Sequence, residues 1–192
     1  MTDGIATNPT PDARTRVLDA AEAIVQARGV AGLTLEAAAR DAGVSKGGLL
    51  YHFASKEALL DALLRRLAEF MEREYRACVE AQRPGPGQVA RAMLEWGFGA
   101  GEHACNERHD RAAAVFLAAF HHDPALLDPI REVIARMRRD IAADGLPPGH
   151  GDAINAAGDG MFMARIFRLY RPSEAERLAM RHALARLLDA SG

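Results

Sequence analysis

The sequence predicts an all-α protein of about nine helices. Apolar residues recur along most of the chain at the i, i+3, i+4, i+7 spacing that places them on one face of a helix. Alanine is abundant and only 6% of the residues are aromatic, a composition that favours helix over strand. No segment shows the alternation of apolar and polar residues that is typical of a strand.

The first 11 residues are rich in threonine, proline and small polar residues, so residues 1–11 are expected to form a disordered arm. Thr10 is expected to cap the first helix, with Pro11 at its first position and Gly29 at its end. The buried face of this helix is predicted from its apolar spacing: Val17, Ala20, Ala21, Ile24 and Ala27.

Residues 34–57 contain the signals for two short helices and the start of a third. Thr34 and Ser45 are suited to cap the first two helices, and Ser55 the third. Gly43 lies between the two short helices, where the chain needs a positive φ. Two short helices joined by such a turn form a helix-turn-helix, whose second helix enters the major groove of DNA.

The second of these helices, residues 46–53, carries features suited to a close approach. Gly47 and Gly48 each cost about 1 kcal/mol relative to alanine in a helix interior. A helix kept only for packing would gain from their replacement, whereas a missing side chain lets the backbone approach a phosphate or a base edge. Near the two glycines in the sequence are side chains whose hydrogen-bond donors and flat rings can contact phosphates: Lys46, Tyr51, His52 and Lys56.

Residues 12–72 resemble the DNA-binding domain of the tetracycline repressor (TetR) family, most strongly at Gly32 to Leu35, Val44 to Gly47 and Leu50 to Leu60. Ala38 departs from the pattern, because the family usually has Ile or Val there. The resemblance implies contacts to the DNA backbone from Thr34, Ser45, Lys46, Tyr51, His52 and Lys56, with further phosphate contacts near Arg14 and Arg16. It also implies that three residues face the bases: Gly47, Gly48 and Leu49.

The rest of the chain is predicted to form a second helical domain, so the expected division is a DNA-binding domain at 12–57 and an effector-binding and dimerisation domain at 58–192. A long helix is expected from Ser55 to Gln82, where the Pro- and Gly-rich residues 83–87 end it. Ser173 and Glu176 form the capping box of the last helix. The other helices are expected at about 88–104, 106–122, 124–144 and 152–170, with Pro129 favouring a later start for the third.

The last two helices, about 152–170 and 173–190, suggest a homodimer through a four-helix bundle. Gly158 and Gly160 allow a close helix approach, and the final helix has a continuous leucine face. The family resemblance implies the same arrangement. A two-fold dimer would place two recognition helices roughly 34–36 Å apart on a near-palindromic operator. The alternative is that these faces pack only within one chain.

The middle helices concentrate large flexible and aromatic side chains, which predicts a pocket for a small, largely apolar effector. Its predicted wall includes Met93, Trp96, Phe116, Phe120 and Phe162, together with Phe98, Met161, Met163 and Phe167. His121, His103 or Asn106 would supply polar groups. Effector binding would displace the long helix and release the DNA. The alternative is that these residues form an ordinary core.

Composition limits the remaining classes of function. The net charge is −2, and residues 1–60 carry six lysines and arginines against seven aspartates and glutamates, so attraction to DNA is expected to be local and strongly dependent on salt. No catalytic motif, phosphate loop or metal-ligand spacing is present in the sequence, and no cofactor is expected. Five residues are of types that bind metals, and no two histidines among them have the His-x-x-x-His spacing that would place both on one face of a helix: His103, Cys105, His109, His121 and His122.

Cys78 and Cys105 do not form a disulfide framework, and no signal peptide or membrane span is seen, which favours the cytoplasm. The sequence therefore predicts a dimeric, ligand-responsive transcriptional regulator, most simply a repressor. The alternative is a helical enzyme or adaptor with a vestigial helix-turn-helix.

Overall fold

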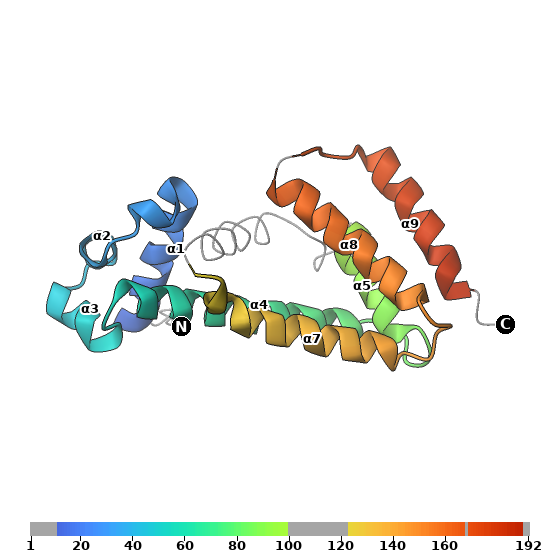
Figure 1. Cartoon of the computed structure of the whole chain (residues 1–192), viewed down its shortest axis with the longest axis horizontal. Helices are drawn as coiled ribbons and strands as arrows, with labels where there is room; N and C mark the ends of the chain where they lie inside the picture. The colour runs from blue at the N-terminus through green and yellow to red at the C-terminus, as the bar shows by residue number, and fades with distance from the viewer. Residues whose placement is uncertain (1–10, 100–122, 168, 190–192) are drawn as a thin grey trace, which may run out of the picture. The chain divides into compact units, whose positions relative to one another are not determined.

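The computed structural model describes residues 11–99, 123–167 and 169–189 (Figure 1). These residues form eight α-helices and one short 3-10 helix, with no strand among them, which confirms the all-α prediction. The chain divides into two compact units, Met1–Leu63 and Leu64–Gly192, and the boundary falls within a long helix, α4 (Lys56–Glu80). The expected division after residue 57 is a functional one and stays a prediction. Apart from Pro11, the expected N-terminal arm lies outside the described residues.

The first unit contains α1 (Ala13–Gly32), α2 (Leu35–Asp41), α3 (Lys46–His52) and the start of α4. The helices α1, α2 and α3 all pack against one another. Their shared core consists of small and branched apolar side chains that solvent does not reach, among them Val17, Ala21, Leu33, Ala38, Leu49 and Leu59. This core fixes the orientation of two helices that are too short to be stable alone.

The beginning and end of α1 differ from the expectation. Asp12, rather than Thr10, caps the helix, because its Oδ1 accepts the backbone N–H of Thr15 at 2.7 Å. Gly29 was expected to end the helix; it adopts a φ of 67° and kinks the chain, but the helix continues to Gly32. The buried face is also wider than the predicted stripe, since it includes Leu18 and Val25, whereas Ala27 is exposed.

The turn between α2 and α3 confirms the local signals of the sequence. Thr34 Oγ1 accepts the N–H of Ala37 at 3.0 Å, and Ser45 Oγ accepts the N–H of Gly48 at 3.0 Å. Gly43 has a φ of 64°. The backbone N–H groups of Gly43 and Val44 return to the carbonyls of Arg40 and Ala39 at 3.2 and 3.0 Å. This pair of bonds is a Schellman motif, which satisfies the last carbonyls of α2 while the chain turns.

The second unit continues α4 and adds α5 (Gln88–Phe98), a 3-10 helix η1 (Pro124–Leu127), α7 (Asp128–Ala142), α8 (His150–Ile166) and α9 (Glu174–Asp189). The helix expected at 88–104 ends earlier, because the chain is extended at Gly99 with φ −69° and ψ 171°. The helix expected at 106–122 lies outside the described residues. Pro129 does mark a later start, since it stands in the first turn of α7, where no N–H is required.

The capping box of α9 is confirmed by two bonds. The N–H of Ser173 donates to Glu176 Oε2 at 2.7 Å, and the N–H of Glu176 donates to Ser173 Oγ at 3.3 Å. No described helix is long and apolar enough to cross a membrane.

Helix α5 is held at both ends by residues distant in the sequence. At its start, the carboxylate of Asp144 accepts the N–H groups of Val89 and Ala90 at 2.9 and 2.8 Å. Asp144 thereby replaces the side-chain cap that Gly87 cannot supply. At its end, Arg177 of α9 donates to the carbonyls of Phe98 and Gly99. These bonds pair two N–H groups at the start of α5 and two carbonyls at its end, and so connect α5 to the segment after α7 and to α9.

The crossing of α5 with α8 depends on glycine. A Cβ added to Gly97 would stand 3.2 Å from the Cα of Gly158, which is tighter than ordinary contact. The residue that has to lack a side chain is Gly97, because a Cβ added to Gly158 or to Gly160 would meet no atom within 4 Å. Gly158 contributes only its Cα to the crossing, and Ala164 of the same helix is buried. Gly160 is exposed.

We predict that Asp144→Ala lowers the free energy of unfolding by about 1–3 kcal/mol, because two N–H groups at the start of α5 lose their acceptor in a buried setting. Urea denaturation followed by circular dichroism measures this loss. Asp128→Ala is the control, because Asp128 forms an ion pair with Arg131 at the surface and its removal is expected to change stability far less. Equal losses in the two variants would contradict this role for Asp144.

Candidate nucleic-acid interface and ligand cavity

The exposed face of α3 carries both glycines. A Cβ added to Gly47 would meet no atom within 4 Å, and one added to Gly48 would meet only Ser45 Oγ at 3.2 Å. No packing inside the protein therefore requires glycine at position 47. Next to this bare surface, Tyr51 is 87% exposed and its ring stands edge-on to His52 with the ring centroids 5.1 Å apart. The structure leaves space here for another molecule to touch the backbone of α3.

Leu49 corrects one expectation. It was expected to face the bases, but its side chain is 0% exposed and belongs to the core of the first unit. Residues two apart on a helix point in different directions, so Leu49 and Gly47 cannot share one face. Leu50, which is 40% exposed, instead lies on the outer side one helical turn from Gly47.

The two lysines have different environments. Lys46 is exposed and its Nζ forms an ion pair with Glu36 Oε1 at 2.7 Å, which holds the pKa of that glutamate below its usual value. Lys56 is half-buried and donates to the carbonyl of Val30 at 2.7 Å. The ammonium of Lys56 therefore ties the start of α4 to the end of α1, while that of Lys46 stays accessible to an outside anion.

The arginines near the start of α1 differ in a similar way. Arg16 donates to the carbonyls of Ala42 and Pro11 at 3.3 and 2.9 Å, so its guanidinium supports the fold. Arg14 is exposed and lies over the ring of Phe53, with 5.6 Å between its Cζ and the ring centroid. Of these two, Arg14 keeps its donors available to solvent.

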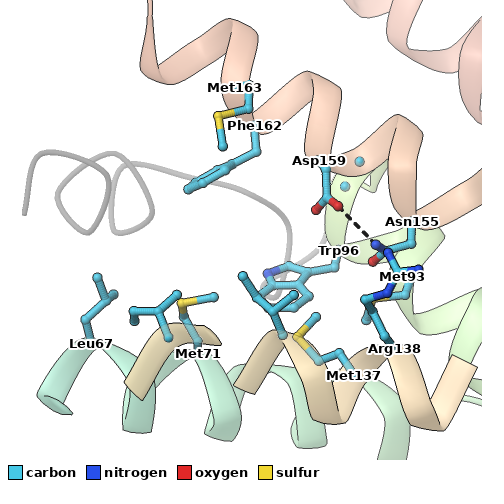
Figure 2. A pocket seen from close by; sticks show the side chains of 14 residues that line it. Leu67, Met71, Met93, Trp96, Met137, Arg138, Asn155, Asp159, Phe162 and Met163 are labelled. Carbon is cyan, nitrogen blue, oxygen red and sulfur yellow. Dashed lines mark hydrogen bonds between the residues drawn. The ribbon is translucent and has the colours of Figure 1, made fainter. Parts of the chain in front are cut away.

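A cavity of about 260 Å³ lies in the second unit among α4, α5, α7 and α8 (Figure 2). Its described wall is formed by Leu67, Met71, Met93, Trp96, Gly97, Ile130, Ile134, Met137, Arg138, Asn155, Gly158, Asp159, Phe162 and Met163. The size is close to the roughly 300 Å³ at which small-molecule pockets begin. Most of the surface that a ligand would meet is apolar.

The structure places part of the predicted effector set at this cavity. Met93, Trp96 and Phe162 lie on its wall, as does Met163. Phe98 instead is fully buried in the core, and Phe167 is exposed, and neither belongs to the described wall. The other predicted positions lie outside the described residues: Phe116, Phe120, His121, His103 and Asn106.

Three polar residues at one side of the cavity were missed from the sequence. Figure 2 shows Arg138, Asn155 and Asp159 together, with Nδ2 of Asn155 donating to Oδ2 of Asp159 at 3.0 Å. Desolvation raises the pKa of Asp159, although the charge of Arg138 and the bond from Asn155 act in the opposite direction. The signal was present, because Asn155 and Asp159 precede Phe162 by seven and three positions and so share its helix face.

No group of three metal-ligating side chains occurs among the described residues. The histidines His103, His109, His121 and His122, together with Cys105, lie outside them. Cys78 is buried, its Sγ donates to the carbonyl of Ala92 at 3.2 Å, and burial raises its pKa to about 11. The thiol of Cys78 therefore stays protonated and unreactive at neutral pH.

The helix-turn-helix with a bare outer face, and a separate helical unit with an apolar cavity, define the class of helical DNA-binding regulators. Residues 17–63 match the family described as bacterial regulatory proteins, tetR family. Residues 87–189 match the family described as tetracyclin repressor-like, C-terminal domain. The second match covers more than half of the chain, so the protein belongs to the TetR family of transcriptional regulators.

Among curated relatives, the chain is 33% identical over 90 residues to the HTH-type transcriptional repressor KstR2 of Mycobacterium tuberculosis, covering 47% of this chain and 44% of KstR2. It is 38% identical over 77 residues to the HTH-type transcriptional regulator UidR of Escherichia coli K12, covering 38% of this chain and 39% of UidR. The chain thus spans less than half the length of each of these curated relatives.

Solved structures match over nearly the whole chain. The multidrug binding protein EbrR complexed with malachite green has a TM-score of 0.63 and 27% identity, covering 93% of this chain and 99% of EbrR. The transcriptional regulator SCO7518 of Streptomyces coelicolor A3(2) has a TM-score of 0.67 at 20% identity, covering 93% and 99% of the two chains, which shows the fold alone.

We predict that Gly47→Ala has opposite effects on folding and on DNA binding. The free energy of unfolding is expected to rise by about 0.5–1 kcal/mol, since alanine favours helix and nothing blocks its Cβ. Affinity for the operator is expected to fall at least about tenfold, or about 1.4 kcal/mol, because position 47 is expected from the sequence to face the DNA, where the new methyl group would stand in the way. Thermal unfolding and fluorescence anisotropy with labelled operator measure the two effects. Unchanged affinity in the stabilised variant would show that this surface does not touch DNA.

Proposed function

We propose that the protein is a transcriptional repressor that binds a near-palindromic operator as a homodimer and is released by a small, largely apolar effector. The observation that carries the proposal is the outer face of α3, where no atom lies next to Gly47 and where Tyr51 and His52 are exposed. No catalytic role is part of the proposal. Because the chromosome it would bind lies in the cytoplasm, we place the protein there.

In this proposal the backbone phosphates are contacted by Lys46, Tyr51 and His52, with the hydroxyls of Thr34 and Ser45 close to the same face. Each hydroxyl accepts a bond from its helix and keeps its own proton to donate. The ion pair of Lys46 with Glu36 is exposed, so water screens it and a phosphate can take the place of the carboxylate. Lys56 contributes by anchoring α4 rather than by touching DNA.

The base-facing surface of α3 comprises Gly47, Gly48 and, in place of Leu49, the side chain of Leu50. An apolar contact of this kind suits the methyl group of thymine, and it offers few hydrogen bonds to base edges. Specificity would therefore depend on shape and on the spacing of two half-sites as well as on direct readout.

Homodimerisation through α8 and α9 is supported by the apolar surface of these helices. Within Glu174–Asp189 no residue is buried, although the helix carries leucines at 178, 184, 187 and 188. Phe167, Leu169 and Tyr170, just after α8, are also exposed. An apolar surface of this kind marks an interaction site. A second copy related by a two-fold axis would cover it and place the two α3 helices for a palindrome.

Effector control would act through α4. This helix supplies Leu67 and Met71 to the cavity wall, and its first residues belong to the DNA-binding unit. A ligand that binds only when α4 is displaced would therefore lower the affinity of the dimer for its operator. A full switch between the two conformations needs the ligand to bind one of them about 5.5 kcal/mol more tightly than the other. The multidrug binding protein EbrR, which has a similar fold, was solved in complex with malachite green and with ethidium, and this supports a ligand-binding role for the present protein.

We predict that Lys46→Ala and Tyr51→Ala each weaken operator binding about tenfold without lowering the melting temperature. Lys46→Ala is also expected to reduce the salt slope of binding by about 1, because one phosphate contact is lost. A gel shift with DNA from beside the protein's own reading frame measures both effects. Arg83→Ala, an exposed cation in the loop before α5, is the control and should bind normally. If the Lys46 or Tyr51 variants unfold instead, those side chains are structural.

The dimer surface is tested with a matched pair of leucines. Leu178 is 39% exposed on α9 and Leu50 is 40% exposed on α3. We predict that Leu178→Glu gives a monomer that has lost operator binding, because the charge has to be buried between subunits. Leu50→Glu should lose operator binding while remaining a dimer. Sedimentation velocity separates the two outcomes, and a dimeric Leu178→Glu variant would exclude this interface.

A further inference from the structure

The cavity has a distinct chemical polarity that goes beyond an apolar pocket. Leu67, Met71 and Phe162 lie toward one side in Figure 2, while Arg138, Asn155 and Asp159 lie together at the other. A ligand that fills the cavity would therefore meet hydrocarbon and aromatic surface along its body and charged groups at one end. The charges at that end decide which kind of ligand is favoured.

Arg138 already has an anionic partner, because its Nη2 lies 3.7 Å from Oδ1 of Asp152. Among the described residues, the hydrogen bond to Asp159 comes from a neutral side chain, since Asn155 donates to its Oδ2, while Arg138 acts on it through its charge. No described residue donates to the other oxygen, Oδ1. Within the part of the chain that the structure describes, Arg138 and Asp159 line this end and Asp152 pairs with Arg138 from outside the wall, so the three leave a balance of one negative charge. This net negative charge attracts one cation and repels an anion.

A bound cation would also stabilise the ionised carboxylate of Asp159. The side chain of Asp159 is exposed. Partial desolvation still raises its pKa, against the opposing effects of Arg138 and Asn155. A positively charged donor beside the carboxylate would favour its ionised form. Trp96 and Phe162, on the same wall, offer aromatic faces that attract cations and stack on flat rings. An apolar cavity of about 150 Å³ holds benzene, so the larger cavity here has room for a two-ring body.

We propose that the effector is an amphipathic amine whose apolar or aromatic body packs against Trp96 and Phe162 and whose protonated nitrogen donates to Oδ1 of Asp159. This inference rests on the proposed function, because it names the chemical class of the ligand that would release the DNA. Asp159 thereby selects the ligand by charge, and the apolar wall selects it by size.

Three probes with one body and different charges test the inference on the full-length protein: naphthylethylamine, naphthylethanol and naphthylacetic acid. Isothermal titration calorimetry at pH 7 gives the three dissociation constants. We expect the amine to bind about tenfold more tightly than the alcohol, as one charge-assisted hydrogen bond in a partly desolvated site allows, and the acid to bind most weakly.

Variants of Asp159 separate charge recognition from structural support. Asp159→Asn should make the affinities for amine and alcohol equal, with the alcohol affinity changed less than about threefold, because only a charge is lost. Asp159→Glu should restore the preference for the amine. Glu132→Gln removes an exposed carboxylate from α7 outside the cavity wall and should leave the preference unchanged. Thermal melting of each variant verifies that the fold is retained.

The outcomes distinguish this inference from the proposed function. A preference for the acid, a preference for the amine that survives Asp159→Asn, or binding of none of the probes would overturn the amine assignment. A gel shift with the same samples tests regulation separately. If the amine binds through Asp159 but leaves operator affinity unchanged, the ligand class stands and effector release fails. If the acid binds best and releases the operator, the ligand class fails and the proposed function stands.

Discussion

The burial of Leu49 is the constraint on which the exposed face of α3, the proposed DNA-binding surface, depends. α3 is only seven residues long, too short to be stable alone, so its rotation is set by what it buries. With Leu49 in the core, the 100° step of the helix directs Gly47 and Tyr51 outward. The Ser45 cap and the turn at Gly43 fix where the helix starts. The exposure of Gly47 on the outer face of α3 thus follows from the burial of Leu49.

In the second unit, the position of α5 is likewise set by residues outside the helix. Asp144 fixes the start of the helix and Arg177 its end, so the wall that carries Met93 and Trp96 is held by residues from outside α5. The close approach of Gly97 to Gly158 then sets how near α8 stands. The polar bonds that hold α5 lie outside the apolar surface of the cavity. Affinity for DNA and for a ligand would be linked through α4, which belongs to both units.

Local signals made much of the fold predictable, because caps and turns depend on neighbouring residues. Thr34, Ser45 and the Ser173–Glu176 box were recognised for that reason. Leu49 was misplaced, because the family resemblance supplied a segment without the rotation of its helix. The spacing of Asn155 and Asp159 to Phe162 places these two on one helix face, but the addition of Arg138 depends on α7 and α8 meeting in space, which no local pattern encodes. The same holds for the capping of α5 by Asp144.

The structure of the dimer bound to operator DNA tests the central claim most directly, through the distance from the Cα of Gly47 to the nearest DNA atom. The account predicts van der Waals contact, at about 3.5–4 Å, with α3 in the major groove and Leu49 still buried. A complex in which another element occupies the groove, with the outer face of α3 remaining in solvent, would contradict it.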